Sequence, residues 1–143
     1  MWRNTRRAAL ACVLALCTGL TGTFVDLHAL HADSFVQELA GRCKGEAAWA
    51  LGACACVARN RLAAGQSETA VLAAFYAAPV APTDAEVRRV GAVLAGGFPC
   101  DPVWFMWSDT DVARLGLNEA DALIRVERGG WVVLFFGREA LDG

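Results

Sequence analysis

Apolar residues beyond residue 33 recur with the spacing of a helical face and predict two helices at the start of the domain. Asp33 or Ser34 can cap the first helix, and Gly45 is expected to end or interrupt it. Its apolar face consists of Phe35, Val36, Leu39, Ala40 and Cys43. A second helix is predicted from about residue 47 to residue 64, with Gly65 as the glycine that stops it. Its inner face should consist of Leu51, Cys54, Ala55, Ala58 and Leu62.

Two further helices are indicated by residues that cap helix N-termini. Ser67 is placed to cap a short third helix, whose inward residues are Val71, Leu72 and Phe75. Thr83 and Glu86 have the Thr-x-x-Glu spacing of a capping box and predict a fourth helix that ends at Gly96 and Gly97. Prolines between these two helices indicate a loop.

After residue 102 the pattern changes to short apolar runs. Residues 103–108 are dense in aromatic side chains and predict a strand, and Ser108 or Asp109 is expected to cap one turn of helix ending near Leu115. Two further runs, separated by an Arg-Gly-Gly turn, predict a hairpin. Its strands are residues 122–127 and 131–136. The expected fold class is therefore α+β, mainly helical with a small C-terminal antiparallel sheet.

The first 32 residues have the features of an export signal. Three arginines precede an uncharged stretch, residues 8–20, whose 13 residues are fewer than the roughly 20 of a membrane-spanning helix. We expect residues 1–32 to be a signal peptide or an uncleaved N-terminal anchor. Cleavage is expected after Ala32 or earlier, near Gly22. Residues 33–143 would then form one domain that is secreted or held in the cell envelope.

The charge of the chain argues against polyanionic partners. The formal net charge is −2 at pH 7, and loss of the leader, with three arginines and one aspartate, would change it to −4. Nucleic acids bind surfaces rich in Lys and Arg, so we expect no nucleic-acid partner. The exported part has no second apolar run long enough to span a bilayer, so membrane contact is expected only through an uncleaved leader.

Four cysteines of the exported part predict two disulfides, because such bonds persist in oxidising compartments. Cys54 and Cys56 lie two residues apart on the second helix, where their side chains point about 200° apart and should not bond each other. The pairings left are Cys43 with Cys54 and Cys56 with Cys100, or Cys43 with Cys56 and Cys54 with Cys100. The Cys-x-Cys spacing on a helix does not suit zinc, so we expect neither a metal nor a cofactor.

The positions of the histidines exclude several kinds of catalysis. His28 and His31 both lie in or beside the leader. Ser-His-Asp and Cys-His mechanisms and histidine-ligated zinc are therefore not expected in the exported domain. Carboxylates, Tyr76, Lys44 and water remain for proton transfer, and a carboxylate is the best candidate.

The segment 41–62 carries residues at a characteristic spacing. Gly45 and Glu46 precede a helix of small residues, and Asn60 follows Glu46 by 14 residues with Arg61 next to it. Later features occur in a matching order: Val71-Leu72 with Tyr76, Val90 and Leu94 before Gly96-Gly97, and Asp101-Pro102 before the aromatic strand. Over roughly residues 34–108 the chain resembles the cell wall hydrolases of the spore-cortex-lytic type.

This resemblance implies a lysozyme-like fold and cleavage of peptidoglycan glycan strands by a lytic-transglycosylase type of reaction. One buried glutamate would protonate the glycosidic oxygen and then take the proton of the sugar's own 6-hydroxyl, which closes an anhydro ring. A second carboxylate is not essential for that reaction, whereas an ordinary glycosidase needs a pair.

The chain departs from the family at its usual catalytic acid. The first glutamate of the family's pair falls on Arg42, which cannot donate a proton usefully at neutral pH. Either Glu46 is the catalytic residue, or the site no longer cleaves glycans. As an alternative, Glu46 can stabilise the start of the second helix through the helix dipole, by about 0.3–1 kcal/mol. Glu38 is spaced to form a surface pair with Arg42.

The resemblance and the residue types give five candidate substrate-binding residues: Trp49, Asn60, Arg61, Tyr76 and Trp104. Asn60 and Arg61 can instead bond a helix end or a neighbouring loop, and the aromatic residues can be core. Three aspartates, Asp101, Asp109 and Asp111, are expected to cap turns rather than to act as a second acid.

The run 103–107 is apolar on both faces of a strand. Alternation places Trp104 and Met106 on one face and Val103, Phe105 and Trp107 on the other. One face should be core, and the other is either a platform for a sugar ring or a contact for the second helix.

Three functions agree with these observations. The first is an exported peptidoglycan-cleaving enzyme that uses Glu46, and the second is an inactive descendant that binds glycan or an envelope partner. The third is an exported domain of unrelated role, which predicts no cleft joining Glu46 to Tyr76 and the aromatic strand.

Overall fold

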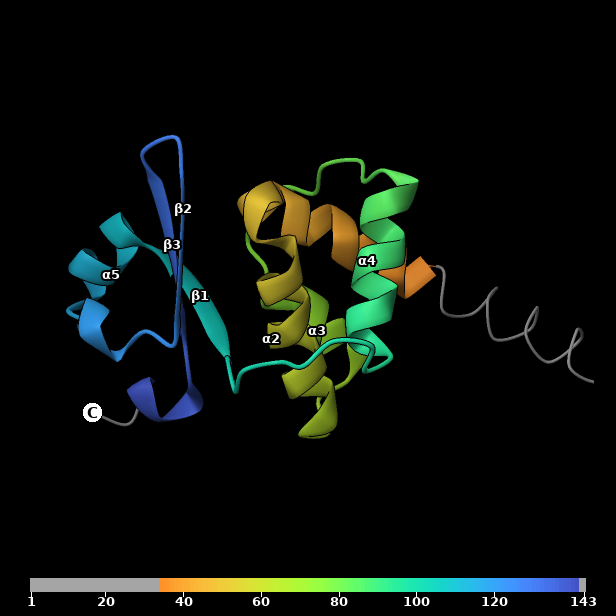
Figure 1. The fold of residues 1–143 in the computed structure, drawn as a ribbon. Helices are drawn as coiled ribbons and strands as arrows, with labels where there is room; N and C mark the ends of the chain where they lie inside the picture. Colours follow the sequence, from red (N-terminus) through yellow and green to blue (C-terminus); the bar gives the residue numbers. More distant parts are fainter. Residues whose placement is uncertain (1–33, 142–143) are drawn as a thin grey trace, which may run out of the picture. The chain divides into compact units, whose positions relative to one another are not determined.

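A computed structural model describes residues 34–141 (Figure 1). The chain divides into two compact units, Met1–Ser34 and Phe35–Gly143, and the account below concerns the second. The expected leader, with its cleavage site and both histidines, lies outside the described residues. None of the helices in the described part combines the length and hydrophobicity needed to cross a membrane.

The first half of the domain is helical, as predicted. A helix over residues 34–47 is followed by the short 3-10 helix η1 (Ala48–Ala50) and by α2 (Leu51–Ala63). The helices α3 (Glu68–Ala73) and α4 (Asp84–Leu94) complete this half. The expectation that Gly45 ends or interrupts the first helix was wrong, because that helix continues to residue 47. Gly45 instead meets the 77–78 segment, whose Ala78 carbonyl oxygen occupies the space of a Cβ.

The predicted caps form and fix where the helices begin and end. The Ser67 hydroxyl accepts a hydrogen bond from the Ala70 N–H, and Thr83 and Glu86 form a reciprocal capping box. Gly65, with a positive φ of 90°, donates to the Leu62 carbonyl, and the next N–H reaches the Arg61 carbonyl. This pair of bonds is the Schellman arrangement, so α2 ends where the glycine predicts.

The second half is a small antiparallel sheet with short helices. Its elements are β1 (Phe105–Ser108), α5 (Asp109–Leu115), η2 (Glu119–Asp121), β2 (Ile124–Arg128), β3 (Trp131–Phe136) and η3 (Arg138–Leu141). The strand order is β1-β3-β2, so the hairpin strand β3 is central and β1 lies at an edge. Gly129 and Gly130 both have positive φ and form the two-residue hairpin turn. The α+β class is therefore confirmed.

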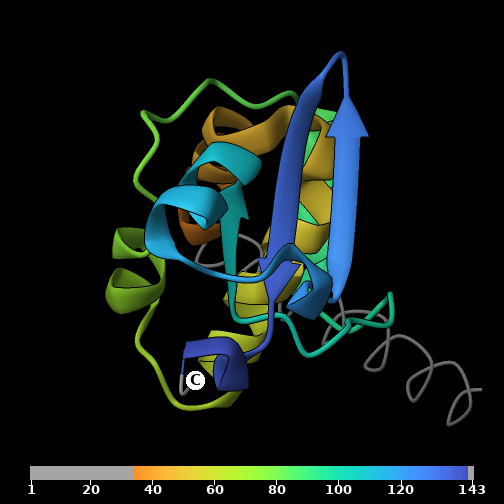
Figure 2. The ribbon, with the colours of Figure 1, turned by 90° about the vertical axis from the view of Figure 1, so that its left-hand side faces the viewer.

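The strand β3 is buried on both faces and joins two hydrophobic clusters. Val133 and Phe135 belong to the larger cluster, formed with the helical half. Val132, Leu134 and Phe136 belong to the smaller cluster, which includes Val112 of α5. The sheet thus lies between the helical half on one face and α5 on the other (Figure 1); Figure 2 views it from the α5 side.

Two disulfides hold α2 in the domain. Cys43 of the first helix bonds Cys54, and Cys56 bonds Cys100 in the segment before β1. Two disulfides are therefore confirmed, and of the two possible pairings this is the one that forms. Cys54 and Cys56 point to different sides of α2. One bond therefore joins α2 to the first helix, and the other joins it to the segment before β1. Disulfides of this kind are typical of an oxidising environment outside the cytoplasm.

Candidate functional site

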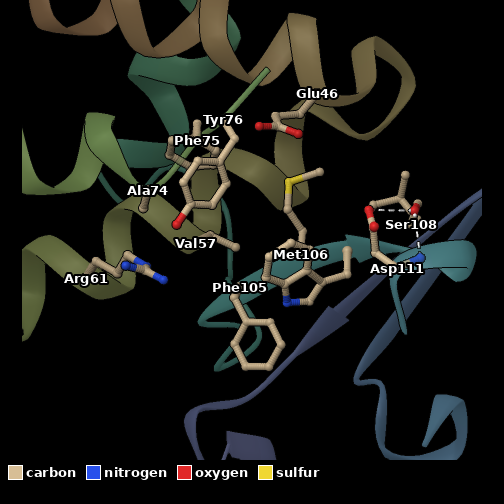
Figure 3. A pocket seen from close by; sticks show the side chains of 12 residues that line it. Glu46, Val57, Arg61, Ala74, Phe75, Tyr76, Phe105, Met106, Ser108 and Asp111 are labelled. Carbon is tan, nitrogen blue, oxygen red and sulfur yellow. Dashed lines mark hydrogen bonds between the residues drawn. The ribbon is translucent and has the colours of Figure 1, made fainter. Parts of the chain in front are cut away.

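A cavity of about 340 Å³ lies where the helical half meets the outer edge of β1 (Figure 3). Residues from both faces of β1 contribute, because the strand has no neighbour on that side. The lining consists of Glu46, Val57, Arg61, Ala74, Phe75, Tyr76, Phe105, Met106, Trp107, Ser108, Asp111 and Val133. The cavity is thus mainly apolar and aromatic, with a few polar groups directed into it, which is the usual composition of a small-ligand site.

Glu46 reaches this cavity from the last turn of the first helix. Its side chain is half-buried, and its Oε1 accepts a hydrogen bond of 2.7 Å from the Ala77 N–H. The bond is possible because Gly45 lets the 77–78 backbone approach the helix more closely than any side chain would allow. The sequence predicted Glu46 at a helix start, whereas it lies near a helix end and is held by a segment 31 residues away.

Tyr76 and Trp107 place two aromatic rings at the cavity. Their ring centroids are 6.4 Å apart with an interplanar angle of 20°, so the rings are stacked. Tyr76 is 81% exposed, which is unusual for a large aromatic side chain and leaves its ring accessible to a ligand. Trp107 comes from β1 and Tyr76 from the loop after α3, so the pair joins the two halves of the domain.

Arg61 borders the same cavity and is fixed by Trp104. Its Nε donates a 2.8 Å hydrogen bond to the Trp104 carbonyl, and its guanidinium lies 5.2 Å from the centre of the Trp104 ring. Burial lowers the pKa of the Arg61 guanidinium, and the nearby Tyr76 hydroxyl acts in the opposite direction. Arg61 is therefore a positive group in a partly desolvated position, where interactions with a polar ligand are stronger than in water.

Three predicted substrate-binding residues lie outside the lining. Asn60 uses its amide to donate to the carbonyls of Asp101 and Val103, at 2.9 and 2.8 Å, and so holds the segment before β1. Trp49 packs against the larger cluster, and its buried Nε1 finds no hydrogen-bond partner among residues 34–141. Trp104 packs against the smaller cluster beneath the guanidinium groups of Arg61 and Arg138.

The predicted alternation in residues 103–107 is correct only within the strand. Phe105 and Trp107 pack with the α5-side cluster and Met106 with the helix-side cluster. Val103 and Trp104 are on the opposite faces from those expected, since Val103 is in the helix-side cluster and Trp104 in the α5-side cluster. The physical reason is that β1 begins at Phe105, so the two-residue period does not extend back to them.

Asp111 borders the cavity although the sequence predicted only a capping role. The cap of α5 is Ser108, whose hydroxyl oxygen accepts the Asp111 N–H, so Asp111 lies in the capped first turn and is not itself the cap. The Ser-x-x-Asp spacing after the aromatic strand could indicate the helix start, but nothing local could indicate that the carboxylate reaches the cavity of Glu46. Ser108 and Trp107 were likewise not predicted as site residues.

Arg42 lies outside the lining. Its Nε and Nη2 donate to Glu38 at 3.2 and 2.9 Å, which confirms the predicted surface pair. Its Nη1 reaches the Phe75 carbonyl at 3.4 Å, so it supports the segment leading to Tyr76. Of the two residues Arg42 and Glu46, only Glu46 borders the cavity.

The geometry is thus a cleft that joins Glu46 to Tyr76 and the aromatic strand, the feature that an unrelated exported domain was expected to lack. Among residues 34–141, no three His, Cys, Asp or Glu side chains gather closely enough to hold a metal ion. No protein-family model, curated protein or solved structure matches this chain.

Proposed function

We propose that this chain is an exported enzyme that cleaves peptidoglycan glycan strands, with Glu46 as its acid and base. The observation that carries the proposal is the shared cavity of Glu46, Tyr76 and Trp107. Export is supported by the leader-like residues 1–32 and by the two disulfides. The lysozyme-like fold and the glycan substrate come from the resemblance to the spore-cortex-lytic hydrolases and are part of the proposal.

The chemistry begins with a proton on Glu46. Since Oε1 already accepts the Ala77 N–H, we assign the transferable proton to Oε2. Glu46 protonates the glycosidic oxygen, and the bond from that oxygen to the sugar's C1 breaks. The 6-hydroxyl of the same sugar then attacks C1 and returns its proton to Glu46, which leaves an anhydro ring. General acid catalysis of this kind contributes about 10²–10⁴ in rate.

The other lining residues would bind the strand. The exposed Tyr76 ring and Trp107 offer apolar faces on which a sugar ring can lie. Arg61 would donate hydrogen bonds to sugar oxygens, since its Nη2 has no partner among residues 34–141. Asn60 and Trp104 would act indirectly, by holding β1 and Arg61 in place.

The test is digestion of purified peptidoglycan by the domain, with products identified by mass spectrometry. We expect anhydro-sugar fragments from the parent and none from Glu46→Gln. Glu38→Gln is the matched control, because Glu38 lies on the same helix, is paired with Arg42 and does not border the cavity. No fragments from a folded parent, or equal release by Glu46→Gln, would reject the proposal.

A second candidate is a domain that binds glycan without cleaving it, and the pairing of Arg42 with Glu38 at the family's acid position favours it. It predicts co-sedimentation with insoluble peptidoglycan that Tyr76→Ala weakens and Glu46→Gln does not change, without release of fragments. Val80→Ala is the control, since Val80 is also an exposed apolar residue but lies outside the cavity.

A further inference from the structure

The cavity contains a second carboxylate, from a part of the chain that the family resemblance does not cover. Asp111 lies on α5, beyond residue 108, and borders the same space as Glu46 (Figure 3). The two residues come from elements that are far apart in sequence and are brought to one cavity by the packing of β1 against α2. Glycosidases that use water place two carboxyl groups on the two sides of the scissile bond, and a shared cavity is the first requirement for such a pair.

The two carboxylates have different surroundings. Asp111 accepts hydrogen bonds of 2.9 Å at both oxygens, from the Ser108 hydroxyl at Oδ2 and from the Arg114 guanidinium at Oδ1. A hydroxyl and a cation as donors suit a carboxylate that carries charge. Glu46 has a backbone N–H as its partner and takes part in none of the ion pairs among residues 34–141.

We propose that Asp111 acts as a general base that directs water to the glycosidic carbon, so that the enzyme hydrolyses part of its substrate instead of forming an anhydro ring at every cleavage. This inference rests on the proposed function. Glu46 gives its proton to the leaving glycosidic oxygen and the C1–O bond breaks. A water oxygen bonds to C1 and its proton passes to Asp111. The proton then returns through solvent to Glu46, and the sum of these steps is the addition of one water across the glycosidic bond.

The position of Asp111 agrees with this role better than with capping alone. Capping of α5 requires only that its N–H meet the Ser108 oxygen. Asp109 begins the same helix and hydrogen-bonds locally to Thr110 without bordering the cavity. The place of Asp111 in the cavity lining is therefore a property that capping does not require.

The experiment measures, after borohydride reduction, the ratio of reducing-end to anhydro fragments released from peptidoglycan. We expect both products from the parent, with the reducing-end fraction at least tenfold lower in Asp111→Asn and the anhydro product retained. Asp111→Glu keeps the charge and the backbone N–H that Ser108 accepts but moves the carboxylate, so it folds and also loses reducing-end product. Asp109→Asn, which removes a charge from the same helix turn, should match the parent.

The outcomes separate this inference from the proposed function. An unchanged product ratio in both Asp111 variants would reject the role of Asp111 and leave Glu46 as the acid. Anhydro fragments alone from the parent would do the same. No fragments from the folded parent would reject glycan cleavage itself, and the role of Asp111 with it.

Discussion

A Cβ at Gly45 would overlap the carbonyl oxygen of Ala78. This close approach connects the first helix to the loop before α4 and places the Ala77 N–H against Glu46. Glycine at position 45 is thus required by a tertiary contact in the last turn of the first helix, although glycine inside a helix is unfavourable by up to about 1 kcal/mol relative to alanine.

Gly45→Ala should therefore destabilise the domain in spite of its better helix propensity. The added methyl group meets backbone that cannot move freely, so we expect a loss of about 1–3 kcal/mol in the free energy of unfolding. Gly52→Ala is the control, because its Cβ would meet only the flexible end of Arg89. Denaturant unfolding should show Gly52→Ala as stable as the parent or more so. Equal stability of the two variants would contradict the close contact at Ala78.

The disulfide that closes the longer loop should contribute more to stability, because the loop-closure entropy grows with the logarithm of loop length. The bonds join residues 11 and 44 positions apart, for which the loss of unfolded-chain entropy corresponds to about 3 and about 4 kcal/mol. The double variant Cys56→Ser with Cys100→Ser should thus have a lower unfolding midpoint than Cys43→Ser with Cys54→Ser. The reverse order would show that packing at these sites outweighs loop closure.

The pairing itself can be checked in the unreduced protein by fragmentation between Cys54 and Cys56 in the mass spectrometer. We expect Cys54 to remain linked to Cys43, and Cys56 to Cys100. The crossed pairing would require α2 to present the opposite cysteine to the first helix, and its detection would contradict the packing described above.

Asn60→Ala should weaken the attachment of β1 to α2. Two hydrogen bonds to carbonyls disappear, at about 1 kcal/mol each, so we expect a loss of about 2 kcal/mol in unfolding free energy. Gln66→Ala is a suitable control, because this half-buried amide accepts only a long 3.5 Å contact from Arg61. A stability of Asn60→Ala equal to that of the control would argue that solvent replaces both bonds.

The ion pair of Glu86 with Lys44 predicts a dependence of stability on pH. The pKa of Glu86 is lowered from its usual value of 4.5, first by the Thr83 N–H and then by the Lys44 ammonium group, 2.9 Å away. A carboxylate with a lowered folded-state pKa contributes stability above its unfolded pKa and loses it as the pH falls through the folded value. Glu86→Gln retains the capping geometry without the charge.

The parent should be more stable than Glu86→Gln at pH 7, and the difference should shrink below pH 4.5. Unfolding curves at a series of pH values measure this difference. Asp84→Asn, in the same helix turn, is the control. Its difference in unfolding free energy from the parent should not shrink in the same way as the pH falls. If the difference in unfolding free energy between the parent and Glu86→Gln is the same at every pH, the charge of Glu86 does not contribute to stability.

Short-range chemistry accounts for the parts of the fold that were predicted correctly. Ser67, Thr83 with Glu86, Gly65 and Ser108 each act on backbone within a few residues, and each begins or ends a helix as expected. The Gly-Gly turn and the apolar runs on both sides of it likewise form the hairpin. The α+β class follows from these local signals alone.

The candidate site was predicted in part. Glu46, Arg61 and Tyr76 border the cavity as their positions in the family-like motifs suggested, whereas Trp49, Asn60 and Trp104 support it from outside or pack in the core. Asn60 and Arg61 are adjacent in sequence, but α2 turns one toward the segment before β1 and the other toward the cavity. No local pattern distinguishes these directions.

The sequence by itself determined the helices, their caps, the hairpin and the need for two disulfides, because those properties depend on neighbouring residues and on the redox chemistry of cysteine. The tertiary structure decided which cysteines pair, why Gly45 lies inside a helix, and that Glu46 and Asp111 share one cavity. These outcomes depend on how closely segments that are dozens of residues apart in the sequence pack against each other. Contacts of this kind are set by the volume and direction of side chains across the whole core, and no short stretch of sequence contains them.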